Sequence, residues 1–284
     1  MALDQLHEHE RYNRKQGEMS FLEHVIELRR HIVRSVIAIA IGAAFCFVFP
    51  EFVFHTLLFG PKKADFVTFR AICSASHSAG LGDRLCFTPH SFEVLTVQLG
   101  ETLMQHLYLS FWIGFTMAFP YIFWQFWQFI SPGMTDQERR VTRNVVGICA
   151  MLFFLGVSFG YFIIAPFSIS FLAGYTVDGV TVSASLSSFV SYMTMLTIPI
   201  GLVFQLPVAI YFMTQLGIVG PAFLKSARRY AFLIILMVSA IITPPDVMSQ
   251  MIVALPLYVL YEVSIVVSSR VYARRVKAMI RSGA

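Results

Sequence analysis

The side chains with the clearest capacity for chemistry are acids and arginines beside the start of an apolar run. The stretch LEHVIELRRH at residues 22–31 leads into IVRSVIAIAIGAAFCFVF, in which Arg34 is the single charge. If this stretch continues the following helix, one stripe of that helix carries Glu23, Glu27, Arg30 and Arg34. A carboxylate pairs bidentately with the planar fork of a guanidinium, in a geometry that a lysine cannot copy. The stretch therefore favours recognition of a cationic ligand.

Both acids also have an ordinary structural explanation. Ser20 followed by Glu23 is the pattern of a capping box, in which each side chain satisfies a free backbone N–H. Glu27 and Arg30 have the spacing of an intrahelical ion pair. Cap chemistry does not reach Glu27, which leaves Glu27 as the stronger candidate for recognition.

A second acidic site follows the next apolar run, in FWQFISPGMTDQERR at residues 126–140. Pro132 and Gly133 end a helix there, and Thr135 can cap a new one whose first turn holds Asp136 and Glu138. Acids in a first helical turn favour the helix dipole, which is the alternative explanation. Two carboxylate sites beside aromatic and apolar residues nevertheless suit a cationic ligand with an apolar neighbour.

The elements that must position these acids are membrane helices. Of the 284 residues, 57% are hydrophobic and only 13% are charged, whereas a soluble domain carries about a quarter charged residues. Because a span needs roughly 20 apolar residues, the uncharged stretches predict an all-α integral membrane protein with six transmembrane helices. Their expected cores are residues 32–49, 104–130, 145–164, 189–216, 230–242 and 248–268. The last two share the short connection TPPD and are expected to be short, tilted or only partly spanning.

The distribution of basic residues predicts the orientation. Seventeen of the 21 lysines and arginines fall in the N-terminal segment, the loops after the second and fourth helices, and the C-terminal tail. By the positive-inside rule that side is the cytoplasm, so both termini are expected there. The chain is interpreted as one membrane domain, 1–284, with a cytoplasmic segment 1–30, a long outer loop 50–101 and a cytoplasmic tail 269–284.

The net charge of +5 follows from these clusters of basic residues, so nucleic acid is not implied. The polar N-terminus does not fit a cleavable signal.

Cysteines and intramembrane polar residues are the remaining candidates. Cys73 and Cys86 both fall in the outer loop, where an oxidising compartment favours a disulfide; the alternative is two free thiols. Gln205, Asp246 and Glu262 are polar residues in or beside apolar runs, and a carboxylate such as Glu262 needs a partner, water or a proton.

No catalytic or metal constellation stands out, and no cofactor is expected. An intramembrane enzyme, for example a lipid transferase using Glu262 and a histidine, would need a nucleophile and a base that converge in one cavity. A proton-coupled transporter would more often show matching halves with interrupted helices. The sequence shows neither pattern.

Five runs together resemble the TatC family, the multispanning receptor subunit of the twin-arginine protein translocase. They occur in the family's order between about residues 21 and 270, and they read FLEHVIELRRH, PYIFWQFWQFISPGMTDQERR, FFLGVSFGYFIIAPF, DGVTVSASLSSFVSY and ITPPDVMSQMIVALPLYVLYEVSI. The resemblance implies six helices in a concave, glove-like arrangement in the bacterial cytoplasmic (inner) membrane, with helices 5 and 6 short. It also implies export of folded proteins driven by the proton-motive force, without a cofactor or chemistry of its own.

The resemblance also implies site residues and partners. Glu27 in IELR and Glu138 in DQERR match the family's two signal-reading acids. The patch around them comprises Phe21, Leu22, Leu28, Arg29, Phe129, Pro132, Arg139 and Arg140. The implied partners are twin-arginine signal peptides of folded cargo, single-span subunits of the TatA and TatB type, membrane lipid, and further copies of the chain. Gln205, Asp246 and Glu262 are expected to dock partners or to satisfy polar contacts within the membrane.

Two features depart from the family pattern. Gln205 occupies a position that is glutamate in many members and glutamine in others, so a protonatable role there is in doubt. The outer loop between residues 51 and 101 is longer than in typical members, and its cysteine pair is not a general family feature.

Overall fold

The computed structural model describes residues 21–78, 80, 82, 86, 92–130, 145–175, 182–243 and 247–282, with the backbone alone at 21–23, 248 and 278–282. This part of the chain is almost entirely helical, as the sequence predicts. Its first elements are α2 (Phe21–Phe47), η1 (Phe52–Leu58), η2 (Gly60–Lys62), α3 (Val67–Ser78), β1 (Glu93–Leu95) and α4 (Glu101–Ile130). The following ones are α6 (Val145–Phe159), η5 (Gly160–Ile164), α7 (Ala165–Gly174), β2 (Ser183–Ser185), α8 (Leu186–Val203), α9 (Leu206–Gln215), α10 (Pro221–Ser226), α11 (Arg228–Ile242) and α12 (Val247–Ser282).

Five helical segments of the described chain are long and apolar enough to cross a membrane. They are His24–Phe47, Glu101–Ile130, Val145–Gly174, Leu186–Gln215 and Ser249–Lys277. The predicted fifth helix corresponds to α11, which has 15 residues and so a length of about 22 Å, less than the ~30 Å of a hydrocarbon core. The prediction that this helix is short is therefore confirmed.

The prediction that the sixth helix is short is wrong. α12 has 36 residues and continues well beyond residue 268, where the apolar run ends. Arginine, lysine and alanine are good helix formers, so the basic tail extends the helix instead of ending it. The loss of hydrophobicity marks where the helix would leave a membrane, not where it stops.

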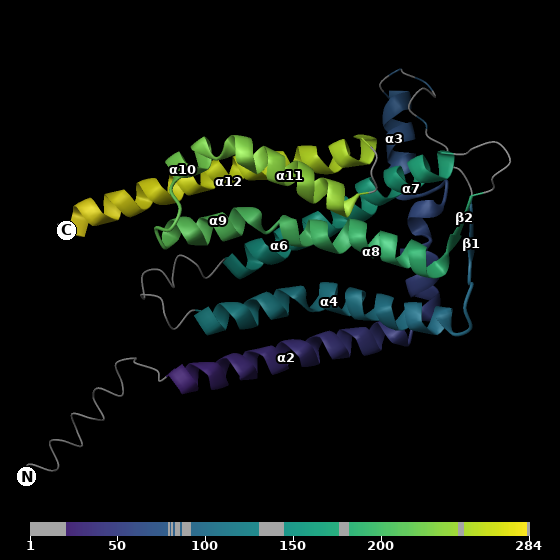
Figure 1. The fold of residues 1–284 in the computed structure, drawn as a ribbon, viewed down its shortest axis with the longest axis horizontal. Helices are drawn as coiled ribbons and strands as arrows, with labels where there is room; N and C mark the ends of the chain where they lie inside the picture. The colour runs from purple at the N-terminus through teal and green to yellow at the C-terminus, as the bar shows by residue number, and fades with distance from the viewer. Residues whose placement is uncertain are drawn as a thin grey trace, which may run out of the picture.

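The long helices lie side by side, with α2 at one edge and α11 and α12 at the other (Figure 1). α2 begins and α12 ends at one end of the molecule, which we call the terminal end; α4 and α9 also finish there. β1, β2 and α3 lie at the opposite end, the sheet end. The two strands pair in parallel with Glu93 opposite Ser183, a feature that the sequence analysis did not predict. The start of α2 and the end of α12, which are the first and last described helix ends, thus share one end of the bundle.

Prolines interrupt two of the long helical segments. Pro207 has no N–H to donate to the turn before it, and the chain breaks between α8 and α9 at Phe204 and Gln205. A π-helical turn, Gly160–Ile164, lies between α6 and α7, and Pro166 in the first turn of α7 follows it directly. Pro166 also lacks an N–H to donate to the turn before it. The break in the fourth segment is what places Gln205 at a helix junction.

Glycines set the closest helix contacts. Gly114 of α4 lies against Gly42 and Ala43 of α2, so closely that a Cβ atom on Gly114 would stand 2.4 Å from the Ala43 nitrogen. Small residues allow membrane helices to approach closely and gain packing contacts. The α2–α4 pair formed in this way carries the candidate site.

Candidate functional site

The candidate site lies where the first turns of α2 meet the last turns of α4, at the terminal end. Its described members are His24, Glu27, His31, Gln125 and Phe129, and we call this group the Glu27 site. Helical spacings of three and four place the two histidines and Glu27 on one side of α2. One turn of α4 separates Gln125 from Phe129, so both can face the same helix.

Contacts of two kinds join the helices at this site. His31 Nδ1 lies 2.5 Å from Gln125 Oε1, and both side chains are buried. The Phe129 ring stacks on His24 with 4.4 Å between ring centroids, and its edge faces His31 at 6.4 Å. Phe129 of α4 therefore faces histidines that lie on either side of Glu27 in the chain.

The Glu27 carboxylate is held loosely. Its Oε1 atom lies 4.0 Å from His31 Nε2, and its side chain remains 30% exposed. Among the described side chains His31 is the one basic group within 4.0 Å, so the Glu27–Arg30 pair considered above is not formed. A partly exposed carboxylate can accept hydrogen bonds from a cation, and an aromatic ring on the neighbouring helix can contact the cation's planar face.

The predicted members of the site divide into three groups. Phe129, from the loop patch, stacks on His24, three residues before Glu27, and Leu28 and Arg29 are exposed on α2. Only the backbone of Phe21 and Leu22 is described. Pro132, Glu138, Arg139 and Arg140 lie outside the described residues, as does Ser20 of the capping box.

Sequence reasoning missed His24, His31 and Gln125. The two imidazoles lie three residues before and four residues after Glu27, a spacing that was available as a signal. Gln125 is a polar residue in the aromatic run PYIFWQFWQF, but its partner is 94 residues away in the chain. Only the close contact between α2 and α4 joins them.

The intramembrane polar residues have partners within the fold. Gln205 Nε2 donates a hydrogen bond to the Cys149 carbonyl oxygen of α6 at 3.0 Å, while Gln205 Oε1 is buried with no partner among the described groups. Glu262 of α12 forms an ion pair with Arg228 of α11 at 2.8 Å, where both side chains are more than a third exposed. Asp246 lies outside the described residues. The carboxylate that the sequence left unpaired thus joins two neighbouring helices.

Glu101 was not singled out from the sequence, yet it organises the sheet end. Its carboxylate accepts hydrogen bonds from the N–H groups of Val97 at 2.7 Å, Gln98 at 3.2 Å and Ser187 at 2.8 Å, and it is 8% exposed. These bonds tie the start of α4 to the first turn of α8. Glu101 therefore links two long helices through backbone groups.

The chain between α2 and α4 contains a disulfide. Cys73 on α3 is joined to Cys86, as the sequence favours. His77 lies one turn after Cys73, and the three potential ligand atoms of this group fall within 4.8 Å of one another. Sulfur atoms joined in a disulfide are not available as thiolate ligands, so this group is a covalent cross-link in the structure.

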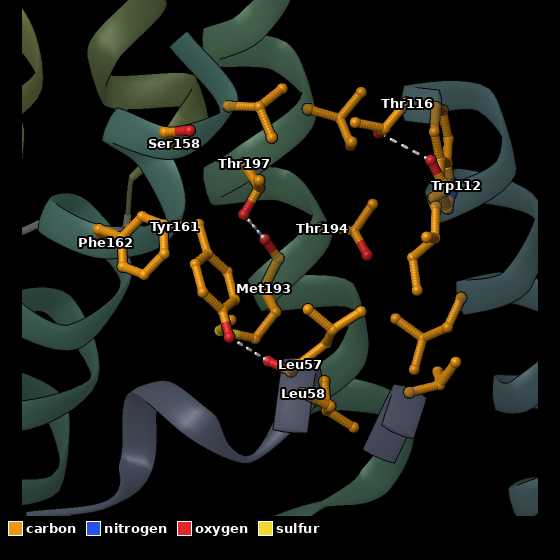
Figure 2. A pocket seen from close by; sticks show the side chains of 15 residues that line it. Leu57, Leu58, Trp112, Thr116, Ser158, Tyr161, Phe162, Met193, Thr194 and Thr197 are labelled. Atoms are coloured by element: carbon orange, nitrogen blue, oxygen red, sulfur yellow. Dashed lines mark hydrogen bonds between the residues drawn. The ribbon is translucent and has the colours of Figure 1, made fainter. Parts of the chain in front are cut away.

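An apolar cavity of about 270 Å³ lies nearer the sheet end, between η1, α4, η5 and α8 (Figure 2). The hydroxyls of Thr116 and Thr197 donate to carbonyl oxygens of their own helices at 2.8 and 2.7 Å, and the Tyr161 hydroxyl donates to the Leu57 carbonyl at 2.8 Å. No acid, histidine or cysteine is among the described residues that line it. The cavity can hold an apolar group but offers no nucleophile with an adjacent base.

Comparison with known proteins gives one consistent result. The family described as Sec-independent protein translocase protein (TatC) matches residues 23–256. The chain is 36% identical over 263 residues to a TatC protein of Blattabacterium sp. subsp. Periplaneta americana, covering 89% of this chain and 96% of that one. It is 33% identical over 265 residues to TatCy of Bacillus subtilis, covering 93% of this chain and 94% of that one.

Solved structures agree with the sequence relatives. A crystal structure of the twin-arginine translocase receptor TatC in DDM has a TM-score of 0.69 and 30% identity, covering 87% of this chain and all of that one. A second crystal structure of a twin-arginine translocase receptor TatC has a TM-score of 0.64 and 31% identity. The likeness therefore extends over nearly the whole fold.

Proposed function

From the premise that this chain belongs to the TatC family of Sec-independent protein translocases, we propose that it reads twin-arginine signal peptides through Glu27 and Glu138. The chain is a multi-pass membrane component of protein transport and not an enzyme. In the proposed role it sits in the bacterial inner membrane with the terminal end in the cytoplasm. It spans the membrane with six helices, α11 being the shortest, around a concave face.

The observation that carries the proposal is the state of Glu27. The carboxylate is partly exposed, unpaired with any described arginine, and flanked in the chain by two histidines that the ring of Phe129 faces. A guanidinium can reach it from the terminal end, where the positive-inside rule places the cytoplasm. Twin-arginine signals are addresses read by a receptor, so a geometry that distinguishes arginine from lysine is what the function requires.

The proposed reading of a pair of arginines needs two acids held apart. Glu27 supplies one, and Glu138, matched to the family pattern in DQERR, supplies the other. Each charge-assisted hydrogen bond to a guanidinium is worth roughly 1.5–3 kcal/mol in a partly desolvated site. Loss of either acid should therefore weaken binding on the order of tenfold to a hundredfold.

Quantitative photo-cross-linking of a twin-arginine signal peptide to Glu27→Gln and Glu138→Gln tests the proposal, with each variant checked for normal membrane levels. Both should lose cross-linking strongly, whereas Glu23→Gln should have a mild effect, because a cap residue affects stability more than recognition. A twin-lysine peptide is the matched ligand control. The proposal fails if both variants bind the twin-arginine peptide as the parent does, or still reject the twin-lysine peptide as sharply.

The proposed translocase includes single-span subunits of the TatA and TatB type, further copies of the chain and surrounding lipid, and uses the proton-motive force for export. Gln205 is proposed to help dock a single-span partner, because its buried Oε1 atom lacks a partner among the described groups and would gain one from a polar residue on an incoming helix that reached it. Asp246 and Glu262 are proposed for the same membrane region. Gln205→Leu should weaken cross-linking to the single-span partner but leave signal-peptide cross-links intact.

A further inference from the structure

His31 is buried between α2 and α4, in contact with the acid that is proposed to read the signal. The whole residue is 9% exposed, and its hydrogen-bond partner Gln125 is 2% exposed. The two ring nitrogens face different groups, since Nδ1 lies 2.5 Å from Gln125 Oε1 and Nε2 lies 4.0 Å from Glu27 Oε1. The imidazole therefore connects the buried face of α4 to the exposed carboxylate.

The amide oxygen of Gln125 determines where the ring carries its proton. An amide oxygen can only accept, so Nδ1 must be the donor, and in the neutral ring Nε2 then carries a lone pair. That lone pair cannot bond to the Glu27 carboxylate, which is itself only an acceptor. A second proton on Nε2 creates a cation 4.0 Å from the carboxylate, within range of an ion pair.

We propose that His31 is a positioning residue for arginine recognition. Neutral His31 leaves Glu27 available to the signal peptide. Protonated His31 pairs with Glu27 and so competes with the arginines of the signal peptide. The inference rests on the proposed function, because it concerns the same carboxylate. Gln125 acts through His31 by holding the ring in one orientation. A proton bound at His31 then weakens binding of the arginine pair. Because such coupling is reciprocal, the bound peptide should also disfavour protonation of His31.

Few other described groups can produce the same effect. On α2 the ionisable neighbours of His31 are His24, Glu27, Arg30 and Arg34, of which the arginines keep their charge at all relevant pH values. On α4, the element that packs against α2, the described side chains that form a hydrogen bond or a ring contact with His31 are Gln125 and Phe129, and neither titrates. His24 is the other histidine of the described site, so its variant is tested separately.

The test is the affinity of the purified full-length protein for a fluorescent twin-arginine signal peptide between pH 8 and pH 5.5, the interval in which histidines change charge. For the parent we expect a loss of at least threefold across this interval, with at most a tenfold change per pH unit, since one proton competes. His31→Gln keeps a polar group without titrating, so its affinity should not change over this interval and its profile should be flat. His55→Gln, on η1 near the sheet end, should keep the parent's profile.

Two further variants separate the explanations. Gln125→Leu should lower affinity at pH 8 if the ring needs its anchor, and circular dichroism with size-exclusion chromatography will show whether the variant folds. A flat profile in His24→Gln together with a sloping profile in His31→Gln would assign the effect to His24 and overturn the inference. A parent profile that is already flat would overturn it as well.

The experiment also distinguishes this inference from the proposed function. If Glu27→Gln binds the twin-arginine peptide as tightly as the parent at pH 8, the proposed function fails whatever the pH profile shows. If Glu27→Gln binds weakly but parent and His31→Gln share one profile, recognition through Glu27 stands and the role of His31 is refuted.

Discussion

Gly114 is the position at which one added methyl group should separate α2 from α4. A Cβ atom there would stand 2.4 Å from the Ala43 nitrogen, 2.9 Å from the Ala43 Cα and 2.9 Å from the Gly42 carbonyl carbon. These are backbone atoms, so no side-chain rotation relieves the overlap, and ordinary contact at 3.4 Å requires a shift of about 1 Å. Overpacking of this kind costs about 1–3 kcal/mol in well-packed interiors.

The matched control is Gly147→Ala in α6, where an added Cβ atom meets nothing within 4 Å. Both variants gain the same helix propensity, about 1 kcal/mol for alanine over glycine, so the difference between them isolates the packing cost. Thermal unfolding in detergent, followed by tryptophan fluorescence, should show Gly147→Ala at or above the parent's Tm and Gly114→Ala below it. Equal unfolding temperatures for the two variants would refute the close contact between α2 and α4.

The same substitution should affect the Glu27 site. The His31–Gln125 bond is 2.5 Å long, and a helix shift of about 1 Å would take it beyond the usual limit of 3.2 Å for such a bond. Gly114→Ala should therefore also weaken signal-peptide binding at pH 8, although Gly114 lies 11 residues from Gln125 along α4. Unchanged binding in a destabilised Gly114→Ala protein would show that the site does not depend on this contact.

Three further predictions concern the rest of the chain. Mass spectrometry of the alkylated, unreduced protein should show Cys73 cross-linked to Cys86, and replacing both by serine should cost up to roughly 3 kcal/mol on the chain-entropy model; two alkylated thiols would contradict the disulfide. Glu101→Ala should speed hydrogen exchange of the backbone amides that donate to the Glu101 carboxylate, measured at the starts of α4 and α8. Unchanged exchange would show that Glu101 does not link these two helix starts. Gln205→Leu removes its hydrogen bond to α6 and should lower the free energy of unfolding by about 0.5–1.5 kcal/mol, whereas a stability equal to the parent's would mean that the bond contributes nothing.

The helices could be predicted because a membrane span needs about 20 apolar residues, and the runs that meet this requirement are visible in the sequence. The length of α12 could not be predicted in the same way, since its charged tail remains helical without being apolar. The break at Gln205 and the π-helical turn before Pro166 had visible causes in the prolines, but their form depends on the surrounding helices.

The candidate site was predicted in part. Glu27 and Phe129 followed from local runs of sequence that resemble a family pattern. The hydrogen bond from His31 to Gln125 did not, because neither residue is unusual by itself and 94 positions separate them. Likewise, the partner of Glu262 is an arginine on another helix, which local spacing cannot identify.

The sequence by itself determined the class of protein, the approximate helices and the acid beside the first apolar run, because hydrophobicity and i, i+4 spacing are local properties. The tertiary structure alone decided which polar groups meet. One glycine on each helix, Gly42 on α2 and Gly114 on α4, allows the two backbones to approach closely, and that approach brings His31 to Gln125 and His24 to Phe129. Contacts between distant residues depend on the packing of whole helices, and packing depends on side chains that no single stretch of sequence contains.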